Sequence, residues 1–172
     1  QFGISLTQQR PVGDIIIPAL VNTMVLLLPA LVATAIVSSL AGMYAGWNRG
    51  SWFEQSSIVV TTIFRATPIF VTGIFLLIIF SYGLGWLPAF GMRSPLANPD
   101  GYLDTYLSVD FLKHYLLPFT ATVLFYSGDF LMLARNSVVE RMGSEFLMLH
   151  RAKGLSEMEQ LGRAGRNSLL PL

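Results

Sequence analysis

Long stretches without charged side chains alternate with short polar segments along the chain. Residues 15–48 and residues 66–92 contain no Asp, Glu, Lys or Arg, and between 114 and 134 the only one is Asp129. A helix that crosses a membrane needs about 20 mostly apolar residues. The pattern therefore predicts three membrane crossings, at residues 15–46, 68–86 and 115–134.

Prolines and glycines predict how these crossings are shaped. The first uncharged run is about 50 Å long as a helix, which exceeds the roughly 30 Å of bilayer hydrocarbon, and Pro29 in its middle predicts a kink. Gly42 and Gly46 have the spacing of small residues that lets two helices approach closely. Pro68 predicts a break, because the residue before a proline is pushed away from helical angles. Residues 52–66 are therefore expected to form a separate helix.

The composition supports a membrane protein and excludes several other classes. Of all residues, 53% are hydrophobic and 12% are charged, about half the charge of a soluble domain. The net charge of +1 provides no basic field for nucleic acid, and the absence of cysteine excludes disulfides and thiolate sites. His114 and His150 have no partner at ligand spacing, so we expect no metal site. The expected fold class is all-α, a polytopic helical membrane protein.

The distribution of basic residues predicts the orientation in the membrane. Residues 1–14 and 87–114 together contain three Lys or Arg, whereas residues 47–57 and 135–172 contain seven. Cytoplasmic loops carry the excess of basic residues. We therefore expect 1–14 to be an external segment, 87–114 an external loop and 135–172 a cytoplasmic segment.

Capping signals predict a helix-turn-helix within this cytoplasmic segment. Ser144 is a suitable N-cap, and Glu145 complements the helix dipole in the first turn. Gly154 stands where a residue in the left-handed conformation ends a helix. Ser156 and Glu159 then match a capping box, which starts a second helix.

The same segment carries a family motif. Arg151-Ala152-Lys153-Gly154-Leu155 is followed by Arg-Asn-Ser-Leu-Leu-Pro at 166–171. Together they resemble the EAA loop of ABC-importer permeases, in the variant of the oligopeptide, dipeptide and nickel permeases. Pro-Ile-Phe-Val at 68–71 and Trp-Leu-Pro-Ala-Phe-Gly at 86–91 resemble further parts of these proteins in the same order. His150 departs from the pattern, because the family usually has alanine there.

The resemblance implies a permease subunit without catalysis of its own. Residues 1–172 would be a fragment of one permease transmembrane domain that continues on both sides, multi-pass in the cell membrane and in contact with lipid. It would form half of a translocation pathway for peptides or, alternatively, oligosaccharides or nickel. The implied partners are a second permease, an extracytoplasmic substrate-binding protein and ATPase subunits that bind the ATP, so the chain needs no cofactor. The implied ATPase-docking residues are Glu145, His150, Arg151, Ala152, Lys153, Gly154 and Leu155.

Some alternatives stay open at this stage. Asp129 is a candidate for lining the pathway, because ionisable residues within spans usually face the bundle interior or water. Pairing with Arg65 and capping a broken helix are its other possible roles, and Arg65 is expected to snorkel to the interface. The basic residues near Gly154 suit either an ATPase or anionic headgroups. An ATP-independent channel or an ion-coupled transporter is the alternative of another class.

Overall fold

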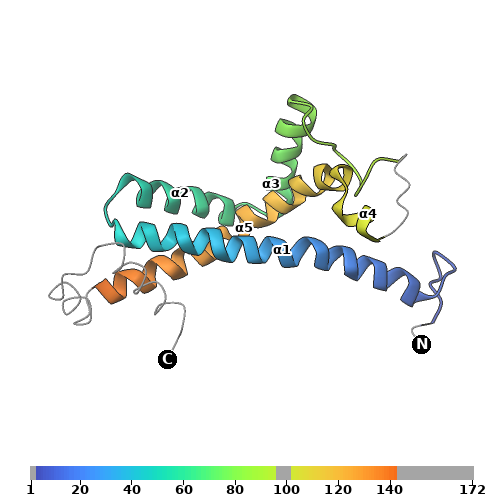
Figure 1. Ribbon diagram of the computed structural model, residues 1–172, viewed down its shortest axis with the longest axis horizontal. Coiled ribbons are helices and arrows are strands. Elements are labelled where there is room, and N and C mark those ends of the chain that lie inside the picture. The colour runs from blue at the N-terminus through green and yellow to red at the C-terminus, as the bar shows by residue number, and fades with distance from the viewer. Residues whose placement is uncertain (1–2, 96–101, 143–172) are drawn as a thin grey trace.

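The computed structural model describes residues 3–95 and 102–142, and the ordered elements within these ranges are all helices (Figure 1). This confirms the all-α class. The elements in chain order are α1 (Val12–Trp47), α2 (Trp52–Ala66), α3 (Ile69–Leu76), the π-helix η1 (Leu77–Gly83), α4 (Tyr102–Leu107) and α5 (Val109–Met142).

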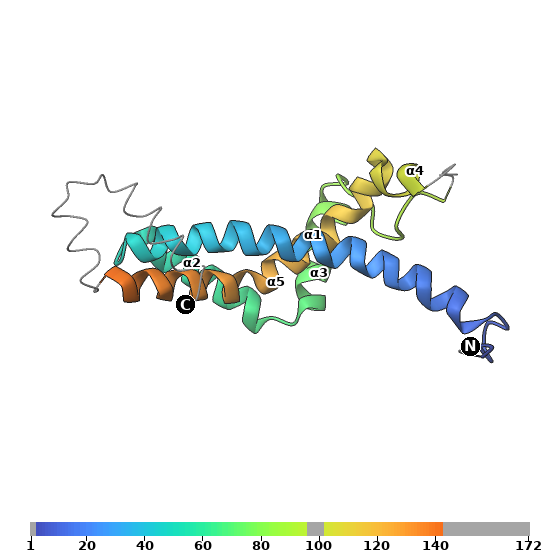
Figure 2. The same ribbon diagram turned by 60° about the horizontal axis from the view of Figure 1, so that its bottom comes forward.

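Two long helices, α1 and α5, form the body of the molecule and cross each other (Figures 1 and 2). Both are long and apolar enough to cross a membrane. α5 is longer than the crossing expected at 115–134, because it takes in residues from the expected external loop and from the start of the expected cytoplasmic segment. Asp110 in its first turn and Arg141 in its last turn both complement the helix dipole, which favours this extension.

A stripe of small residues on α1 lets α5 approach closely. Ala30, Thr34, Ser38, Gly42 and Gly46 recur at every fourth position, on one helix face, and all are buried. A Cβ atom added at Gly42 would lie 2.2 Å from the carbonyl oxygen of Leu131 in α5, and one added at Gly46 would lie 2.7 Å from that of Arg135. The close approach expected from the two glycines is therefore present, with the backbone of α5 as the partner.

α1 remains one helix through Pro29. A proline removes the hydrogen bond to the carbonyl four residues earlier, which here belongs to Val25. The hydroxyl of Tyr115 in α5 donates to this carbonyl over 3.1 Å. Because a bilayer supplies no water to free backbone groups, Tyr115 replaces the bond that Pro29 removes.

Replacing Tyr115 with phenylalanine should lower the free energy of unfolding by about 1–3 kcal/mol, the cost of leaving a buried acceptor unpaired. Pro29→Ala restores a helical donor for Val25, so Tyr115→Phe should cost less in that background. Tyr44→Phe is the control, because the Tyr44 side chain is about half exposed. Thermal unfolding of the purified full-length protein compares the three single variants and the double variant of Pro29 and Tyr115. Equal losses for Tyr44→Phe and Tyr115→Phe would contradict the assignment.

α2 and α3 are separated by a sharp break, as Pro68 predicts. The two helical segments, α2 and α3 with η1, meet at an angle of 106°, and Thr67 has extended angles. α2 lies along α5, whereas α3 rises from the α1–α5 pair (Figure 1). Only with this bent pair counted as one span do the described residues contain three candidate crossings. The second crossing was expected at residues 68–86, and its helical part, α3 with η1, ends at Gly83.

Candidate functional site

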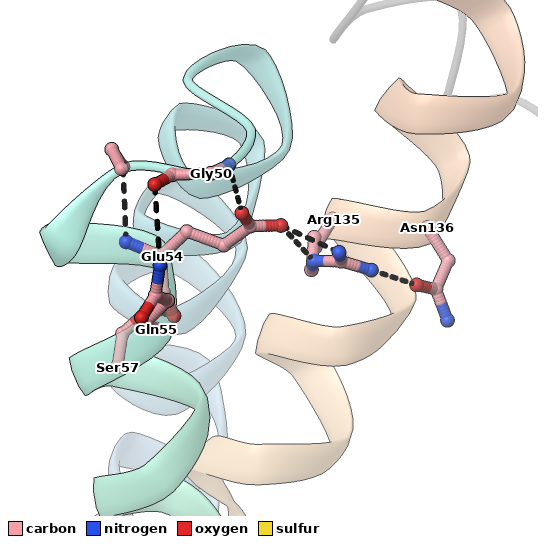
Figure 3. A network of polar contacts seen from close by, with 7 residues as sticks. Gly50, Glu54, Gln55, Ser57, Arg135 and Asn136 are labelled. Carbon is pink, nitrogen blue, oxygen red and sulfur yellow. Dashed lines mark hydrogen bonds and ion pairs between the residues drawn. The ribbon is translucent and has the colours of Figure 1, made fainter.

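A buried ion pair joins the start of α2 to α5 (Figure 3). The Nε and Nη2 atoms of Arg135 donate to Oε1 of Glu54 over 2.7 and 2.5 Å. The side chains are 7% exposed for Glu54 and 19% exposed for Arg135. The second carboxylate oxygen, Oε2, accepts from the backbone N–H of Gly50 over 2.6 Å. Both oxygens of Glu54 are therefore used, and one of them binds the turn that leads into α2.

The local sequence explains why Glu54 points in this direction. Ser51 is the N-cap of α2, and its hydroxyl accepts from the backbone N–H of Glu54 over 3.2 Å. Gly50 has φ of +79°, a region that favours glycine, and this turns its N–H towards the Glu54 carboxylate. The side chain of Gln55 donates to the Gly50 carbonyl over 3.2 Å. The turn between α1 and α2 is thus held by the first residues of α2.

The partner from α5 is positioned by the packing of the long helices. Gly46 of α1 contacts the backbone of α5 at Arg135 itself, so a side chain at residue 46 would displace the arginine. The guanidinium also donates from Nη1 to the side-chain oxygen of Asn136 over 2.9 Å. Arg135 therefore ties α2 to α5 seven residues before α5 ends at Met142.

A second ion pair joins the same two helices but is exposed. Nη2 of Arg65, in the last turn of α2, lies 3.0 Å from Oδ1 of Asp129 in α5. The side chains are 60% and 52% exposed. The pairing of Asp129 with Arg65, one of the roles left open by the sequence, is therefore present. Arg65 makes this contact from the end of α2, next to the break at Pro68.

Close backbone packing fixes this second pair as well. A Cβ atom added at Gly128 would lie 3.3 Å from the carbonyl oxygen of Thr61 and 3.6 Å from Cδ of Arg65. The missing side chain at residue 128 therefore lets α2 lie against α5 one residue before Asp129. Ser127 and Gly128 are buried, and Asp129 is the first exposed residue after them.

A polar cluster fastens the loop after η1 to the start of α5. The backbone N–H and the hydroxyl of Ser94 both donate to the carboxylate of Asp110, over 2.8 and 2.6 Å. His114, whose side chain is 5% exposed, uses its Nδ1 to bond the Asp110 backbone carbonyl at 2.8 Å. His114 also lines two adjoining cavities of about 250 and 260 Å³. The cluster holds the loop at Ser94 against the first turn of α5.

The expected ATPase-docking residues lie outside the described residues, so their arrangement stays a prediction. They are Glu145, His150, Arg151, Ala152, Lys153, Gly154 and Leu155. Within the described ranges, no three His, Cys, Asp or Glu side chains come together as metal ligands would.

The pair of Glu54 and Arg135 was not predicted from the sequence. One signal was available, because Ser51 followed three residues later by Glu54 has the spacing of a capping box and places the start of a helix. Nothing in the local pattern, however, indicates that the carboxylate bonds Gly50 and an arginine 81 positions away. Such a contact depends on how α1, α2 and α5 pack.

Comparison with known proteins identifies the family. Residues 38–172 match the family described as binding-protein-dependent transport system inner membrane component. The chain is 30% identical to a dipeptide transport system permease protein of Alkalihalophilus pseudofirmus and 28% identical to a glutathione transport system permease protein of Shigella flexneri, over 99% of its own length in each case. It is 30% identical to a putative peptide transport system permease protein of Brucella suis over 98% of its length.

These matches cover 55%, 51% and 51% of the relatives, so the chain spans about half the length of the curated relatives it matches. The match with the family nevertheless extends over most of the chain, and its description agrees with apolar helices that can cross a membrane. The chain is a multi-pass cell-membrane protein that belongs to the binding-protein-dependent transport system inner membrane components, the family of ABC-importer permeases.

Proposed function

We propose that this chain is part of a permease subunit that forms half of the translocation pathway of an ATP-driven importer for peptides or similar small solutes. The observation that carries the proposal is the family match over residues 38–172, which includes the segment with the EAA-like motif. The names of the relatives, permeases for dipeptides, glutathione and peptides, favour peptides over oligosaccharides or nickel. The expected partners are a second permease, an external binding protein and ATPase subunits.

The orientation follows from the basic residues. Residues 135–172 carry most of the Lys and Arg outside the crossings expected from the sequence, so the positive-inside rule favours a cytoplasmic location for the end of α5 and for Glu54. The Ser94–Asp110 cluster would then lie at the external side.

The buried pair of Glu54 and Arg135 supports a coupling role for the end of α5. α5 is continuous up to Met142, and the segment with the expected docking residues follows it directly. Because Glu54 ties α5 to α2 near this end, a force applied to the docking segment would reach both helices together. ATP hydrolysis on the ATPase subunits would in this way move α2 and α5 as one unit.

Replacing Gly154 with valine should weaken ATPase docking or uncouple ATP hydrolysis from uptake. Gly154 follows the basic last turn of one expected helix and precedes a capping box, so it is expected in the left-handed conformation. A β-branched side chain there costs roughly 1–2 kcal/mol and would protrude into a partner groove. Gly154→Asn should retain more activity, because asparagine accepts positive φ more readily.

The measurements are ATP-driven dipeptide uptake into proteoliposomes, ATPase activity in the same samples, and co-purification of the ATPase. Gly85→Val is the matched control for a glycine with positive φ, because residue 85 also has positive φ and a Cβ atom added there would meet no heavy atom within 4 Å. It should affect stability rather than coupling. Wild-type uptake and docking in Gly154→Val would contradict the coupling role, and uptake without ATP would favour a channel.

A further inference from the structure

The exposed ion pair between Arg65 and Asp129 lies within candidate membrane spans, where exposing charged side chains to lipid costs free energy. Both residues belong to helices that pass as membrane spans, Asp129 in α5 and Arg65 in the bent pair of α2 with α3 and η1. More than half of each side chain is exposed, and within the described residues no segment covers them. Charged side chains inside a bilayer avoid lipid and face water or protein. This face of α2 and α5 is therefore expected to border an aqueous space or another polypeptide.

The pair has unused bonding capacity. A guanidinium carries five N–H donors, and a carboxylate has two oxygens that each accept more than one bond. The 3.0 Å contact between Nη2 and Oδ1 is the polar contact that the structure shows for these side chains. Among the described residues no other polar partner is shown for them, so most donors of Arg65 and the Oδ2 atom of Asp129 are available for a ligand.

The buried pair provides a comparison within the same two helices. There, Glu54 uses both oxygens on Arg135 and Gly50, and Arg135 uses three nitrogens on Glu54 and Asn136. In that pair every guanidinium nitrogen and both carboxylate oxygens are bonded, and the side chains are shielded, as expected of a structural contact. The Arg65–Asp129 pair has the same types of charge and the same helices, but the structure shows one contact for it and more than half of each side chain is exposed.

Helix packing, rather than a flexible loop, sets the backbone positions from which both charged side chains extend. Gly128 brings α5 against Thr61 of α2 just before Asp129, and Arg65 extends from the last turn of α2. A site whose charged groups are held in place before binding loses less free energy when a ligand arrives.

We propose that Arg65 and Asp129 form a contact site for the two charged ends of a short peptide as it passes through the permease. The inference rests on the proposed import of peptides. At neutral pH a dipeptide carries an ammonium group and a carboxylate, which lie at most about 7 Å apart in the extended form. The free oxygen of Asp129 accepts from the ammonium group, and the free edge of Arg65 donates to the carboxylate. Such a site binds the charged ends of the peptide and does not select among its side chains.

Uptake kinetics form the first test. The full-length permease is reconstituted with its second permease, ATPase subunits and binding protein, and dialanine uptake is measured for Asp129→Asn and Arg65→Gln. Each change should raise the half-saturating dialanine concentration at least about tenfold, the effect of one lost charge-assisted bond, while the amount of assembled complex stays constant. Glu140→Gln is the matched control, because Glu140 is an exposed carboxylate of the same helix. The permease with this substitution should import dialanine with the wild-type half-saturating concentration.

Chemical modification of the wild type forms the second test and needs no variant to assemble. A water-soluble carbodiimide with an added amine is applied during ATP-driven uptake, and modified carboxylates are identified by mass spectrometry. Asp129 should react, and saturating dialanine should slow its reaction at least about tenfold, whereas N-acetyl-dialanine amide, which lacks both charges, should not. Glu140 should react without protection, and buried Glu54 should stay unmodified.

The outcomes separate this inference from the proposed function. An unreactive Asp129 would show that another segment or a second subunit covers it and would overturn the inference. Reaction of Asp129 at the same rate with and without dialanine would overturn the inference too. So would a half-saturating dialanine concentration equal to that of the wild type in both Asp129→Asn and Arg65→Gln, provided that both variants assemble. In each of these cases, ATP-driven dialanine uptake by the wild type leaves the proposed function intact. A wild type that imports no dialanine with ATP would overturn both.

Discussion

Replacing Gly42 with alanine should lower the stability of the protein by about 3 kcal/mol, although alanine is normally the better helix residue. The added Cβ would lie 2.2 Å from the Leu131 carbonyl oxygen and 3.0 Å from the Leu131 Cα. These are backbone atoms of α5 and cannot rotate away as a side chain could. The two helices must therefore separate along the stripe, and the contacts at its other buried positions loosen with them.

The same substitution at Gly13 is the matched control. Gly13 lies in the first turns of the same helix, and a Cβ there would meet no heavy atom within 4 Å. Gly13→Ala should leave stability unchanged or raise it by up to about 1 kcal/mol, since glycine is the poorer helix former. The midpoint of thermal unfolding of the purified full-length protein compares the two variants. A similar midpoint for both would mean that α1 and α5 do not pack at Gly42 as described.

The glycine pair shows what a sequence can predict about a helix interface. The spacing of Gly42 and Gly46 indicates that a neighbour comes close, because only small residues permit backbone contact. It does not indicate which helix comes close. The partner residues Leu131 and Arg135 lie about 90 positions further along the chain, and their register depends on the full set of packed side chains.

The break between α2 and α3 was predictable for a local reason. Thr67 precedes Pro68, and a proline ring disfavours helical angles at the residue before it, although α1 continues through Pro29. The ends of α5 were less predictable. The apolar run indicated residues 115–134, but a helix continues into polar sequence where its first and last turns carry favourable charges, as Asp110 and Arg141 do.

Of the two ion pairs in the candidate site, the sequence indicated the exposed pair and not the buried pair. Asp129 was noticeable from its isolation in an uncharged run, and its pairing with Arg65 was one of the alternatives. Glu54 and Arg135 gave no comparable signal, because both lie in polar segments where charged residues are common. Their burial results from the close approach of α1 to α5 and from the turn at Gly50, which no local pattern reports.

Breaking the buried pair should cost far more than breaking the exposed one. Glu54→Gln leaves the Arg135 guanidinium, which is 19% exposed, without its counter-charge. We expect a loss of about 3 kcal/mol in the free energy of unfolding, the lower end of the range for a buried ion pair that loses one partner. Arg135→Gln should cost a similar amount, because the shielded Glu54 carboxylate then keeps only its bond from Gly50. Asp129→Asn, in the exposed pair, should cost no more than about 1 kcal/mol.

A double-mutant cycle tests whether Glu54 and Arg135 act on each other. Glu54→Gln with Arg135→Gln leaves no unpaired buried charge, so the double variant should lose less than the sum of the two single losses, with a coupling of roughly 1–3 kcal/mol. The corresponding cycle for Arg65 and Asp129 should give a coupling below about 1 kcal/mol. Thermal unfolding of the full-length protein in detergent measures both cycles. Additive losses at Glu54 and Arg135 would contradict the buried pair. A large coupling at Arg65 and Asp129 would assign that pair a structural role in place of a site open to a ligand.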